Sequence, residues 1–564
     1  MISFKYSTSK MIELISDTFH GELYNTCIQC PDRKSFKNSK FFFLNTYANI
    51  EYFLNKYPEA KWFELDQILK EYYEFKKNEK QLLAIDKTDF TNSDFKFKTK
   101  PYDHQLQAFE ISKNLKEYGL LFEQGCGKSK VIIDNADYLY QQGKIDTLII
   151  IAPNGVHKNW LTEEKIIHSD QKYIEFIWQT NFNKKSMEDW NTFKYIHTLG
   201  LNIFSFNIET FVSEKSRKEL IDILKHNKCM LVVDESHKIK NPSAKRTKFL
   251  IEISKLPLYK RILTGTPIAN GAQGFYTQFK FLNPNIIGIS SYYAFRAKYC
   301  VMGGWENKQI IGYKHIEELQ NKIKAYSMRV LKKDCLDLPD KIYQEEMFDM
   351  TKQQRMLYEE VKEEGIASLN EGEPLIFDNI MAKMAKLRQI SSGFIKEPET
   401  GKCIEIVPMN KNPRLLKLLD LLEQINGKVI IWTTQIYDID IIMKTLQNKA
   451  VRYDGQISSE EKEQNKNRFK TDPNIKYFVI NIQMPEGLTL TEAETTIYYT
   501  NTFDLEKRIQ SEDRNHRIGT KNNVNYIDIC CNQTIDKKIV RILRKKKTIS
   551  EMILQDPKSF FLEY

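Results

Sequence analysis

A glycine-rich segment near residue 125 carries the residue types that hold phosphate groups. The stretch Glu123–Ser129 reads EQGCGKS and follows the apolar run Gly119–Phe122. Such a turn from a strand into a helix directs backbone N–H groups at phosphate oxygens. In this pattern Lys128 reaches the outer phosphates and Ser129 binds Mg²⁺. Two glycines, Gly125 and Gly127, allow the backbone to approach the phosphate groups closely. The full pattern has glycine where Phe122 stands, so a chance Gly-Lys-Ser turn is the alternative.

An acidic pair about 100 residues further along strengthens this interpretation. Asp234 and Glu235 end the apolar run Met230–Val233, which is typical of a buried parallel strand. The carboxyl ends of such strands face the ligand crevice in open α/β sheets. There one carboxylate can bind Mg²⁺ while the next polarises an attacking water. We assign Asp234 to the metal and Glu235 to the water; the alternative is an acidic pair on the surface.

Two series of short apolar runs, separated by helical patterns, predict the elements that position these residues. The first series is Leu120–Phe122, Thr147–Ala152, Asn202–Phe206, Met230–Val233 and Arg261–Leu263. The second series is Lys428–Trp432, Ala450–Tyr453, Tyr477–Asn481, Thr495–Tyr499 and Val524–Ile529. This alternation indicates parallel sheets covered by helices. The sequence therefore predicts two α/β lobes joined by a mostly helical, charged section over about residues 285–410.

Longer motifs in the first lobe resemble those of a known family. FEQGCGKS, VVDESHKIKN and LTGTPIANG resemble motifs I, II and III of superfamily 2 helicases. IIAPNGVHKNWLTE resembles motif Ia of the Snf2 family of double-stranded DNA translocases, in which the first glycine of motif I is usually missing, as it is here. KVIIWTTQ, EGLTLTEAETTIYY and QSEDRNHRIG in the second lobe resemble motifs IV, V and VI. The resemblance covers about residues 97–545.

The resemblance implies an α/β fold with two RecA-like lobes, a helical insertion and a small N-terminal α+β domain. We expect an N-terminal accessory domain over 1–95, lobe 1 over 96–285, the insertion over 286–410, lobe 2 over 411–545 and a tail over 546–564. Aromatic and lysine residues are frequent in the first 95 residues, and Ala60–Lys77 has helical periodicity. These aromatic residues form either the core of that domain or a surface that recognises DNA structure.

Further site residues follow from the resemblance alone. Gln105 matches the glutamine that reads adenine; the alternative is an exposed helical glutamine, with Gln107 close by. Arg514 and Arg517 match the motif VI arginines that contact the phosphates from the second lobe, and Gln510 lines the same cleft. On a helix the two arginines would share one face. The nucleic-acid contacts implied are Lys158, Asn159, Lys238, Lys240, Thr264, Thr266, Thr489 and Thr491. For Thr264 and Thr266, which match motif III, the sequence leaves open whether the hydroxyls touch a phosphate or Glu235.

The function implied is that of a monomeric ATP-dependent translocase on double-stranded DNA, with ATP and Mg²⁺ as cofactors. Such a motor remodels DNA structures or displaces bound proteins. Two alternatives remain open: a strand-separating superfamily 2 helicase acting on DNA or RNA, and a motor subunit of a larger defence or restriction complex.

Composition sets broad limits on the class of protein. The 564 residues carry a formal net charge of +10, which allows a polyanionic partner without requiring one. No apolar run approaches the roughly 20 residues that span a bilayer. The nine cysteines show no disulfide spacing, and Cys27 and Cys30, with His20 upstream, lack the second pair of a zinc site. We expect a cytoplasmic protein of bacterial, phage or viral origin, with a nuclear location as the alternative.

Overall fold

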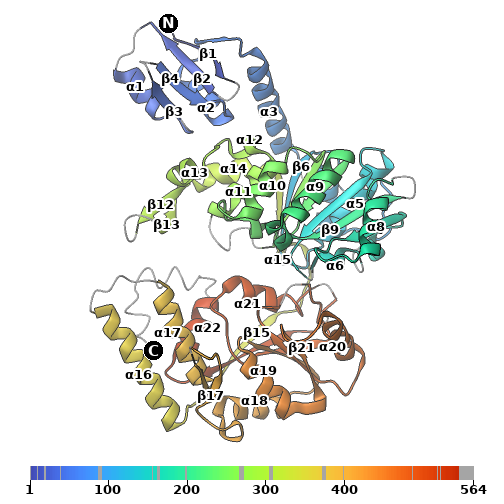
Figure 1. Cartoon of the computed structure of the whole chain (residues 1–564), viewed down its shortest axis with the longest axis vertical. Helices are drawn as coiled ribbons and strands as arrows, with labels where there is room; N and C mark the ends of the chain where they lie inside the picture. The colour runs from blue at the N-terminus through green and yellow to red at the C-terminus, as the bar shows by residue number, and fades with distance from the viewer. Residues whose placement is uncertain are drawn as a thin grey trace. The chain divides into compact units, whose positions relative to one another are not determined.

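The computed structural model divides the chain into two compact units, Met1–Cys335 and Leu336–Tyr564 (Figure 1). It describes all residues except 1, 9–10, 18–20, 33, 38–39, 87–89, 91, 155, 162–164, 197–199, 266–271, 304–308, 371–376, 398, 485–486, 518, 521 and 545–564. Each unit is built around a parallel sheet, and the first unit carries an additional N-terminal sheet.

The main sheet of the first unit has seven parallel strands in the order β14-β6-β11-β10-β7-β9-β8. Its strands are β6 (Glu117–Phe122), β7 (Thr147–Ala152), β8 (Tyr173–Ile177), β9 (Leu201–Asn207), β10 (Cys229–Val233), β11 (Tyr259–Leu263) and β14 (Ser327–Val330). Every residue of the central strands β7 and β10 is buried. Helices therefore cover both faces of the sheet, which explains the continuous apolar runs.

Helices and short connections complete this lobe (Figure 1). They are α4 (Asp103–Ser112), α5 (Lys128–Gln141), α6 (Val156–Asn159), α7 (Lys165–His168), α8 (Lys184–Phe193), η3 (Ile208–Val212), α9 (Glu214–His226), η4 (Ser236–Ile239), α10 (Lys245–Ile253) and α11 (Gln273–Leu282). After them come α12 (Pro284–Ile287), α13 (Tyr292–Tyr299), β12 (Cys300–Gly303), β13 (Gln309–Tyr313), α14 (Ile316–Lys324) and α15 (Lys332–Cys335). The fully buried Arg261 of β11 donates to the carbonyls of Ser112 and Leu115 at 2.8 and 2.9 Å. It thereby satisfies backbone acceptors at the end of α4.

The N-terminal sheet has the order β3-β4-β2-β1-β5, and β5 alone pairs in parallel. Its strands are β1 (Ile2–Thr8), β2 (Met11–Ser16), β3 (Lys34–Lys37), β4 (Lys40–Leu44) and β5 (Lys61–Phe63), and its helices are α1 (Gly21–Ile28), α2 (Tyr47–Lys56) and α3 (Asp66–Ala84). The prediction of a helix over Ala60–Lys77 is wrong at its start. Lys61–Phe63 pairs with β1 instead, and the helix begins at Asp66.

The N-terminal sheet contacts the rest of the first unit through its helices and the loop after α1. The Asp32 carboxylate accepts hydrogen bonds from Ser290 N at 2.6 Å and Ser290 Oγ at 2.8 Å. The Phe75 ring on α3 stacks on that of Tyr326, with centroids 5.6 Å apart. A buried carboxylate bound by two donors and an aromatic stack fix this contact.

The second unit is a six-stranded parallel sheet in the order β15-β22-β21-β18-β20-β19. Its strands are β15 (Lys341–Phe348), β18 (Lys428–Thr433), β19 (Ala450–Tyr453), β20 (Tyr477–Asn481), β21 (Ala493–Tyr498) and β22 (Val524–Cys531), and a small hairpin pairs β16 (Phe394–Lys396) with β17 (Cys403–Glu405). The helices are α16 (Lys352–Asn370), α17 (Phe377–Ser391), η6 (Met409–Lys411), α18 (Pro413–Gln424), α19 (Ile436–Leu446), η7 (Gln447–Lys449), α20 (Ser459–Thr471), α21 (Leu505–Glu512) and α22 (Ile535–Arg544).

The predicted fold class is confirmed, since all ten apolar runs are strands of two parallel sheets. The range 286–410, expected as a helical insertion, is divided between the two units at Cys335. It also contributes an edge strand to each sheet, β14 and β15. The domain boundaries themselves stay predictions. Each described helix is too short or too polar to cross a membrane.

Candidate active site

The glycine-rich loop connects β6 to α5 and has the backbone conformation that glycine permits. Gly125 and Gly127 have φ values of +83° and +78°, in the left-handed region, and Gly127 caps the N-terminus of α5. A Cβ atom at Gly127 would lie 2.1 Å from Gln105 Nε2. Both the backbone conformation and the close approach of Gln105 therefore require glycine here.

Gln105 lies against this loop instead of on the protein surface. Its Nε2 donates to the Cys126 carbonyl at 3.3 Å, and its Oε1 accepts from Tyr102 N at 3.0 Å. The neighbouring His104 places Nε2 at 2.9 Å from the same Cys126 carbonyl. Gln105 is only 3% exposed, so the alternative of an exposed helical glutamine is wrong. Its role in reading adenine stays a prediction.

Lys128 and Ser129 occupy the first turn of α5. The Lys128 ammonium donates to the carbonyls of Phe122 at 2.9 Å and Glu123 at 3.4 Å, so it lies inside the loop. Ser129 is half-buried beside it. A lysine in the first turn of a helix adds its positive charge to the backbone N–H groups of that turn, and this combination suits an anion.

The last residues of the first unit also contact this loop. Cys126 Sγ lies 3.9 Å from Cys335 Sγ, and Glu123 Oε2 accepts from Lys332 N at 2.8 Å. Burial raises the pKa of the Cys126 thiol to about 12. Cys126 is therefore a protonated packing residue at neutral pH, and α15 is fastened to the loop.

The acidic pair lies at the carboxyl end of β10, as predicted. Asp234 Oδ2 accepts from Trp160 Nε1 at 3.0 Å, and its Oδ1 accepts from Glu235 N at 2.8 Å. Burial raises the pKa of the Asp234 carboxyl and the adjacent Glu235 charge raises it further, whereas Lys128 lowers it. Two adjacent buried carboxylates are stabilised by a cation, so this end of the strand suits a divalent metal.

Glu235 is held in an unusual backbone conformation. Its φ of +46° lies in the left-handed region, which non-glycine residues rarely adopt. Its Oε1 accepts from Gln124 Nε2 at 3.3 Å, and its Oε2 lies 3.2 Å from His237 Nδ1. The same His237 nitrogen lies 3.4 Å from Thr264 Oγ1. The strained residue is thus positioned by side chains from three loops that follow β6, β10 and β11.

Three residues of this site were missed from the sequence: Gln124, Trp160 and His237. Trp160 and His237 lie inside the segments that resemble motifs Ia and II, so those motifs were the available signal. Gln124 is the second residue of the EQGCGKS loop. A Cβ atom at Gly265 would lie 2.7 Å from Gln124 Cγ, so the loop after β11 must pass close to this glutamine.

The predicted nucleic-acid residues fall into different environments. On α6, Lys158 is exposed and Asn159 is half-buried, and Lys238 and Lys240 are half-buried in and after η4. Thr264 is fully buried, so its side chain cannot touch a nucleic acid from this position, contrary to the prediction. Thr266 lies outside the described residues. Two half-buried threonines belong to the second unit: Thr489 and Thr491.

In the second unit, Arg514 and Arg517 lie beyond the end of α21, which stops at Glu512. The expectation that they share one helical face is therefore wrong. Arg514 is 8% exposed and donates to the carbonyls of Gln510 at 3.1 Å and Leu488 at 3.2 Å. Arg517 is half-buried and donates to Thr489 Oγ1 at 2.7 Å. The segments that resemble motifs V and VI are thus bonded to each other.

Gln510 and a neighbouring arginine lie inside the protein. Gln510 is 1% exposed, and its Nε2 donates to Glu506 Oε1 at 3.2 Å. Arg508, which the sequence did not single out, pairs with Asp528 and binds Glu512 Oε1 at 2.9 Å. Burial alone would raise the pKa of Glu512, but Arg508 and Lys341 lower it to about 2. This buried ion cluster holds α21 on the sheet.

Possible metal ligands are scattered over the described part of the chain. None of its His, Cys, Asp and Glu side chains form a group of three or more that could hold a metal ion. Cys27 and Cys30 belong to the N-terminal core, while His20 lies outside the described residues. A Mg²⁺ that accompanies a nucleotide needs only one or two protein carboxylates, because phosphate oxygens and water complete its shell.

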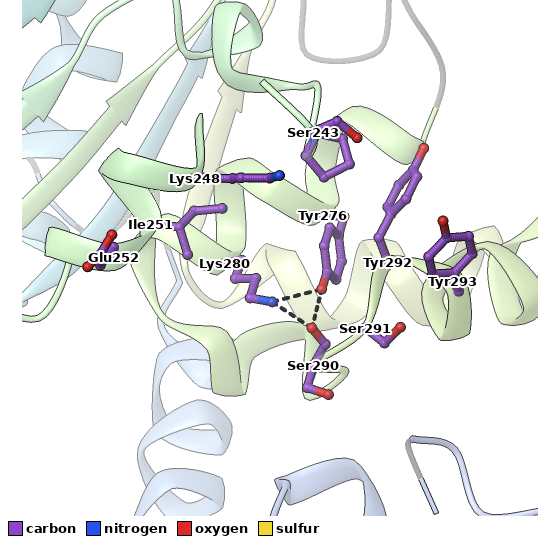
Figure 2. A pocket seen from close by; sticks show the side chains of 11 residues that line it. Ser243, Lys248, Ile251, Glu252, Tyr276, Lys280, Ser290, Ser291, Tyr292 and Tyr293 are labelled. Atoms are coloured by element: carbon purple, nitrogen blue, oxygen red, sulfur yellow. Dashed lines mark hydrogen bonds between the residues drawn. The ribbon is translucent and has the colours of Figure 1, made fainter. Parts of the chain in front are cut away.

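A cavity of about 490 Å³ lies beside α10 and α11 and shares no lining residue with the glycine-rich loop (Figure 2). Figure 2 shows Lys280 pointing to Tyr276 and Ser290, and its ammonium donates to the Tyr276 hydroxyl at 2.9 Å. Burial lowers the pKa of Lys280. The ammonium is already bound by groups of the wall, so the cavity offers no unpaired charge at this point.

Comparison with known proteins decides the family. The SNF2-related domain matches residues 102–393, and the helicase conserved C-terminal domain matches residues 410–519. The chain belongs to the Snf2 family of superfamily 2 helicase-like ATPases. The first match covers the glycine-rich loop and the acidic pair, and the second covers Arg514 and Arg517. Membership of this family implies that the chain uses a nucleotide.

Curated relatives are similar over part of their length. The chain is 26% identical over 390 residues to the TATA-binding protein-associated factor mot1 of Aspergillus fumigatus, covering 60% of the chain and 20% of that protein. It is 23% identical to the ISWI chromatin-remodeling complex ATPase CHR11 of Arabidopsis thaliana, covering 80% and 43%. It is 26% identical to the DNA annealing helicase and endonuclease ZRANB3 of Bos taurus, covering 77% and 39%. The chain thus spans from a fifth to less than half of the length of these relatives.

A solved structure is also similar to this Snf2-family chain. The Sulfolobus solfataricus SWI2/SNF2 ATPase core in complex with dsDNA is 22% identical, with a TM-score of 0.36, and covers 84% of this chain and 97% of that one.

Proposed function

We propose that the chain is a monomeric ATP-dependent motor that moves along double-stranded DNA and remodels DNA structures or displaces bound proteins. One observation supports the proposal: the Lys128 loop follows β6 and the acidic pair Asp234–Glu235 follows β10, two strands of one parallel sheet that are separated by β11. Gln124 joins them, since it lies in the loop and donates to Glu235. Both halves of a phosphoryl-transfer site are thereby present in one lobe.

Different residues of the first unit have different roles in ATP hydrolysis. Backbone N–H groups of the loop and the Lys128 ammonium bind the phosphates, and Gln105 reads the adenine edge. Ser129 and Asp234 would hold Mg²⁺, whose charge would offset that of the phosphates. Glu235 orients the attacking water and accepts its proton. His237 and Gln124 fix that carboxylate, so it is in position before the nucleotide binds.

Two groups of residues couple hydrolysis to DNA. Arg514 and Arg517 are assigned to the phosphates in the catalytically active state, because a planar guanidinium binds phosphate with two hydrogen bonds. Lys158, Lys238 and Lys240 are assigned to backbone phosphates of DNA, which carry no sequence information. A motor that steps along any sequence needs contacts of this kind. The similarity to a chromatin-remodelling ATPase and to a DNA annealing helicase supports the assignment to DNA.

The test is the rate of ATP hydrolysis by the purified chain with single-stranded, duplex and forked DNA and with RNA. We expect duplex or forked DNA to give the largest stimulation. Displacement of a third strand from a triplex, without separation of the duplex strands, would support translocation. Processive unwinding of RNA would overturn it in favour of a helicase, and the absence of any DNA stimulation would favour a subunit that works only within a larger complex.

A further inference from the structure

Among the residues that the structure describes, helices pack on one face of the N-terminal sheet, and the opposite face, called the uncovered face below, carries exposed side chains. Its core contains Phe4, Leu14 and Phe41 from three neighbouring strands, together with residues of α1, α2 and α3. All three helices therefore pack on the same face. The contacts to the rest of the first unit, made by Asp32 and Phe75, also come from that helical side.

Alternation along the strands places a different set of side chains on the opposite face. Phe42 lies between the buried Phe41 and Phe43, and Phe63 follows Trp62, which packs against the core. In the sheet register Phe63 pairs with Lys5, Lys5 with Glu13, and Glu13 with Phe42. Phe63 is 51% exposed and Phe42 is half-buried. One row across the sheet thus presents two aromatic rings with charged residues between them.

Lysine residues surround these rings. Lys40 and Lys61 are exposed, and the Lys5 side chain is 44% exposed. Glu13 is the acidic member of the row: its carboxylate is 2.9 Å from Lys40 Nζ and 3.9 Å from Lys5 Nζ, and it is 7% exposed. Three lysines and one ion-paired glutamate leave the face positively charged.

We propose that this uncovered face binds single-stranded DNA. The bases stack on the Phe42 and Phe63 rings, and Lys5, Lys40 and Lys61 neutralise the phosphates. An open antiparallel face with separated aromatic rings suits unpaired bases, because bases in a duplex are stacked on each other and do not offer their faces. The face is distinct from the motor of the parallel sheets, so it would hold a single strand while that motor acts on the adjoining duplex.

The experiment measures binding of a fluorescently labelled dT oligonucleotide to the full chain by anisotropy, without nucleotide. Phe42→Ala combined with Phe63→Ala should weaken binding about tenfold or more. The matched control is Tyr24→Ala with Phe36→Ala, two exposed aromatic residues that contact each other at 5.9 Å and lie away from the proposed face. This control should bind as the unchanged chain does.

A second measurement separates phosphate contacts from a change in folding. Lys40→Ala with Lys61→Ala should reduce the slope of log K against log salt concentration by about 0.7 for each lysine. Lys56→Ala with Lys70→Ala, exposed lysines on α2 and α3, should leave the slope unchanged. A purely structural effect would lower affinity without changing this slope.

The proposal is overturned if the Phe42/Phe63 variant binds the oligonucleotide normally, or if the Tyr24/Phe36 control loses as much affinity. It is also overturned if binding of a labelled duplex falls as far as that of the single strand. None of these measurements uses ATP hydrolysis, so failure of the motor function proposed above would not be confused with failure here.

Discussion

The two kinds of sheet in this protein use their surfaces differently. The seven-stranded parallel sheet buries both faces, and its candidate chemistry gathers where β6, β10 and β11 end. The N-terminal sheet is mostly antiparallel, buries one face under three helices, and leaves Phe63 and Lys61 exposed on the other. A parallel sheet between helices offers a ligand only its edge, whereas a sheet covered once offers a whole face.

The six-stranded sheet of the second unit follows the first pattern. Its candidate residues, Arg514 and Arg517, also lie in a loop region, after the end of α21, and not on the face of a strand. Because the two kinds of site lie on different sheets, ATP hydrolysis and single-strand binding should be separable by mutation. Substitutions in the loops should abolish ATP turnover and leave binding of single-stranded DNA unchanged. Substitutions on the N-terminal face should weaken that binding and leave ATP turnover unchanged.

The largest effect is expected for Arg517→Ala. If this half-buried guanidinium stabilises the phosphates during transfer, kcat should fall about 10³- to 10⁵-fold with little change in Tm. Arg514→Ala should differ, because it removes a buried donor to two carbonyls and should also lower stability by about 1–3 kcal/mol. Steady-state kinetics and thermal unfolding of both variants provide the check. Equal behaviour of the two would show that burial does not distinguish their roles.

Changes in the first lobe should be nearly as severe. We expect Glu235→Gln to lower kcat about 10²- to 10⁴-fold, since the amide cannot accept the proton of water. Lys128→Ala should lower it about 10²- to 10³-fold through loss of charge at the phosphates. Binding of the dT oligonucleotide should be unchanged in both. A parallel loss of single-strand affinity would break the separation between the two kinds of sheet.

A smaller effect is expected for His237→Ala. The ring lies between Glu235 and Thr264, and its removal leaves the carboxylate less well oriented, so kcat should fall about 10- to 100-fold. His226→Ala, at the exposed end of α9, is the matched control and should retain full activity. A His237→Ala enzyme with normal kcat would show that Gln124 alone positions Glu235.

The smallest effect concerns the attachment of the N-terminal sheet. Asp32→Ala removes two hydrogen bonds to Ser290 and should lower the free energy of unfolding by about 1.5–3 kcal/mol. Urea unfolding, combined with Ser290→Ala in a double-mutant cycle, isolates the side-chain part of this energy. Additive losses in the cycle would mean that the hydrogen bond from the Ser290 hydroxyl to Asp32 contributes nothing to stability.

The parallel strands that the sequence predicted and those it missed differ in position within the sheets. The ten predicted strands are apolar runs, and β7, β10 and β20 are buried at every residue. β8 and β15 form sheet edges and expose polar residues, so they contain no continuous apolar run. A continuous apolar run indicates a strand that is buried on both faces, and β8 and β15 lack one, although the edge strand β19 was predicted.

The candidate site shows the same division. Spacing along the chain identified Lys128, Asp234 and Glu235, because a loop and a strand end are local features. Trp160 and Gln124 were missed, since they meet the acidic pair across 74 and 111 residues. The residues next to Trp160 and Gln124 in the sequence do not predict that either side chain contacts the acidic pair.

By itself, then, the sequence determined the order of the motifs, the central strands and the residues at their ends. Only the tertiary structure decided which aromatic residues of the N-terminal sheet form its core, which arginine is anchored by carbonyls, and which sheet face stays uncovered. The physical reason is that backbone conformation responds to neighbouring residues, whereas burial is decided by segments that are far apart in the chain. The N-terminal face is defined by the packing of three helices on the other side of its sheet.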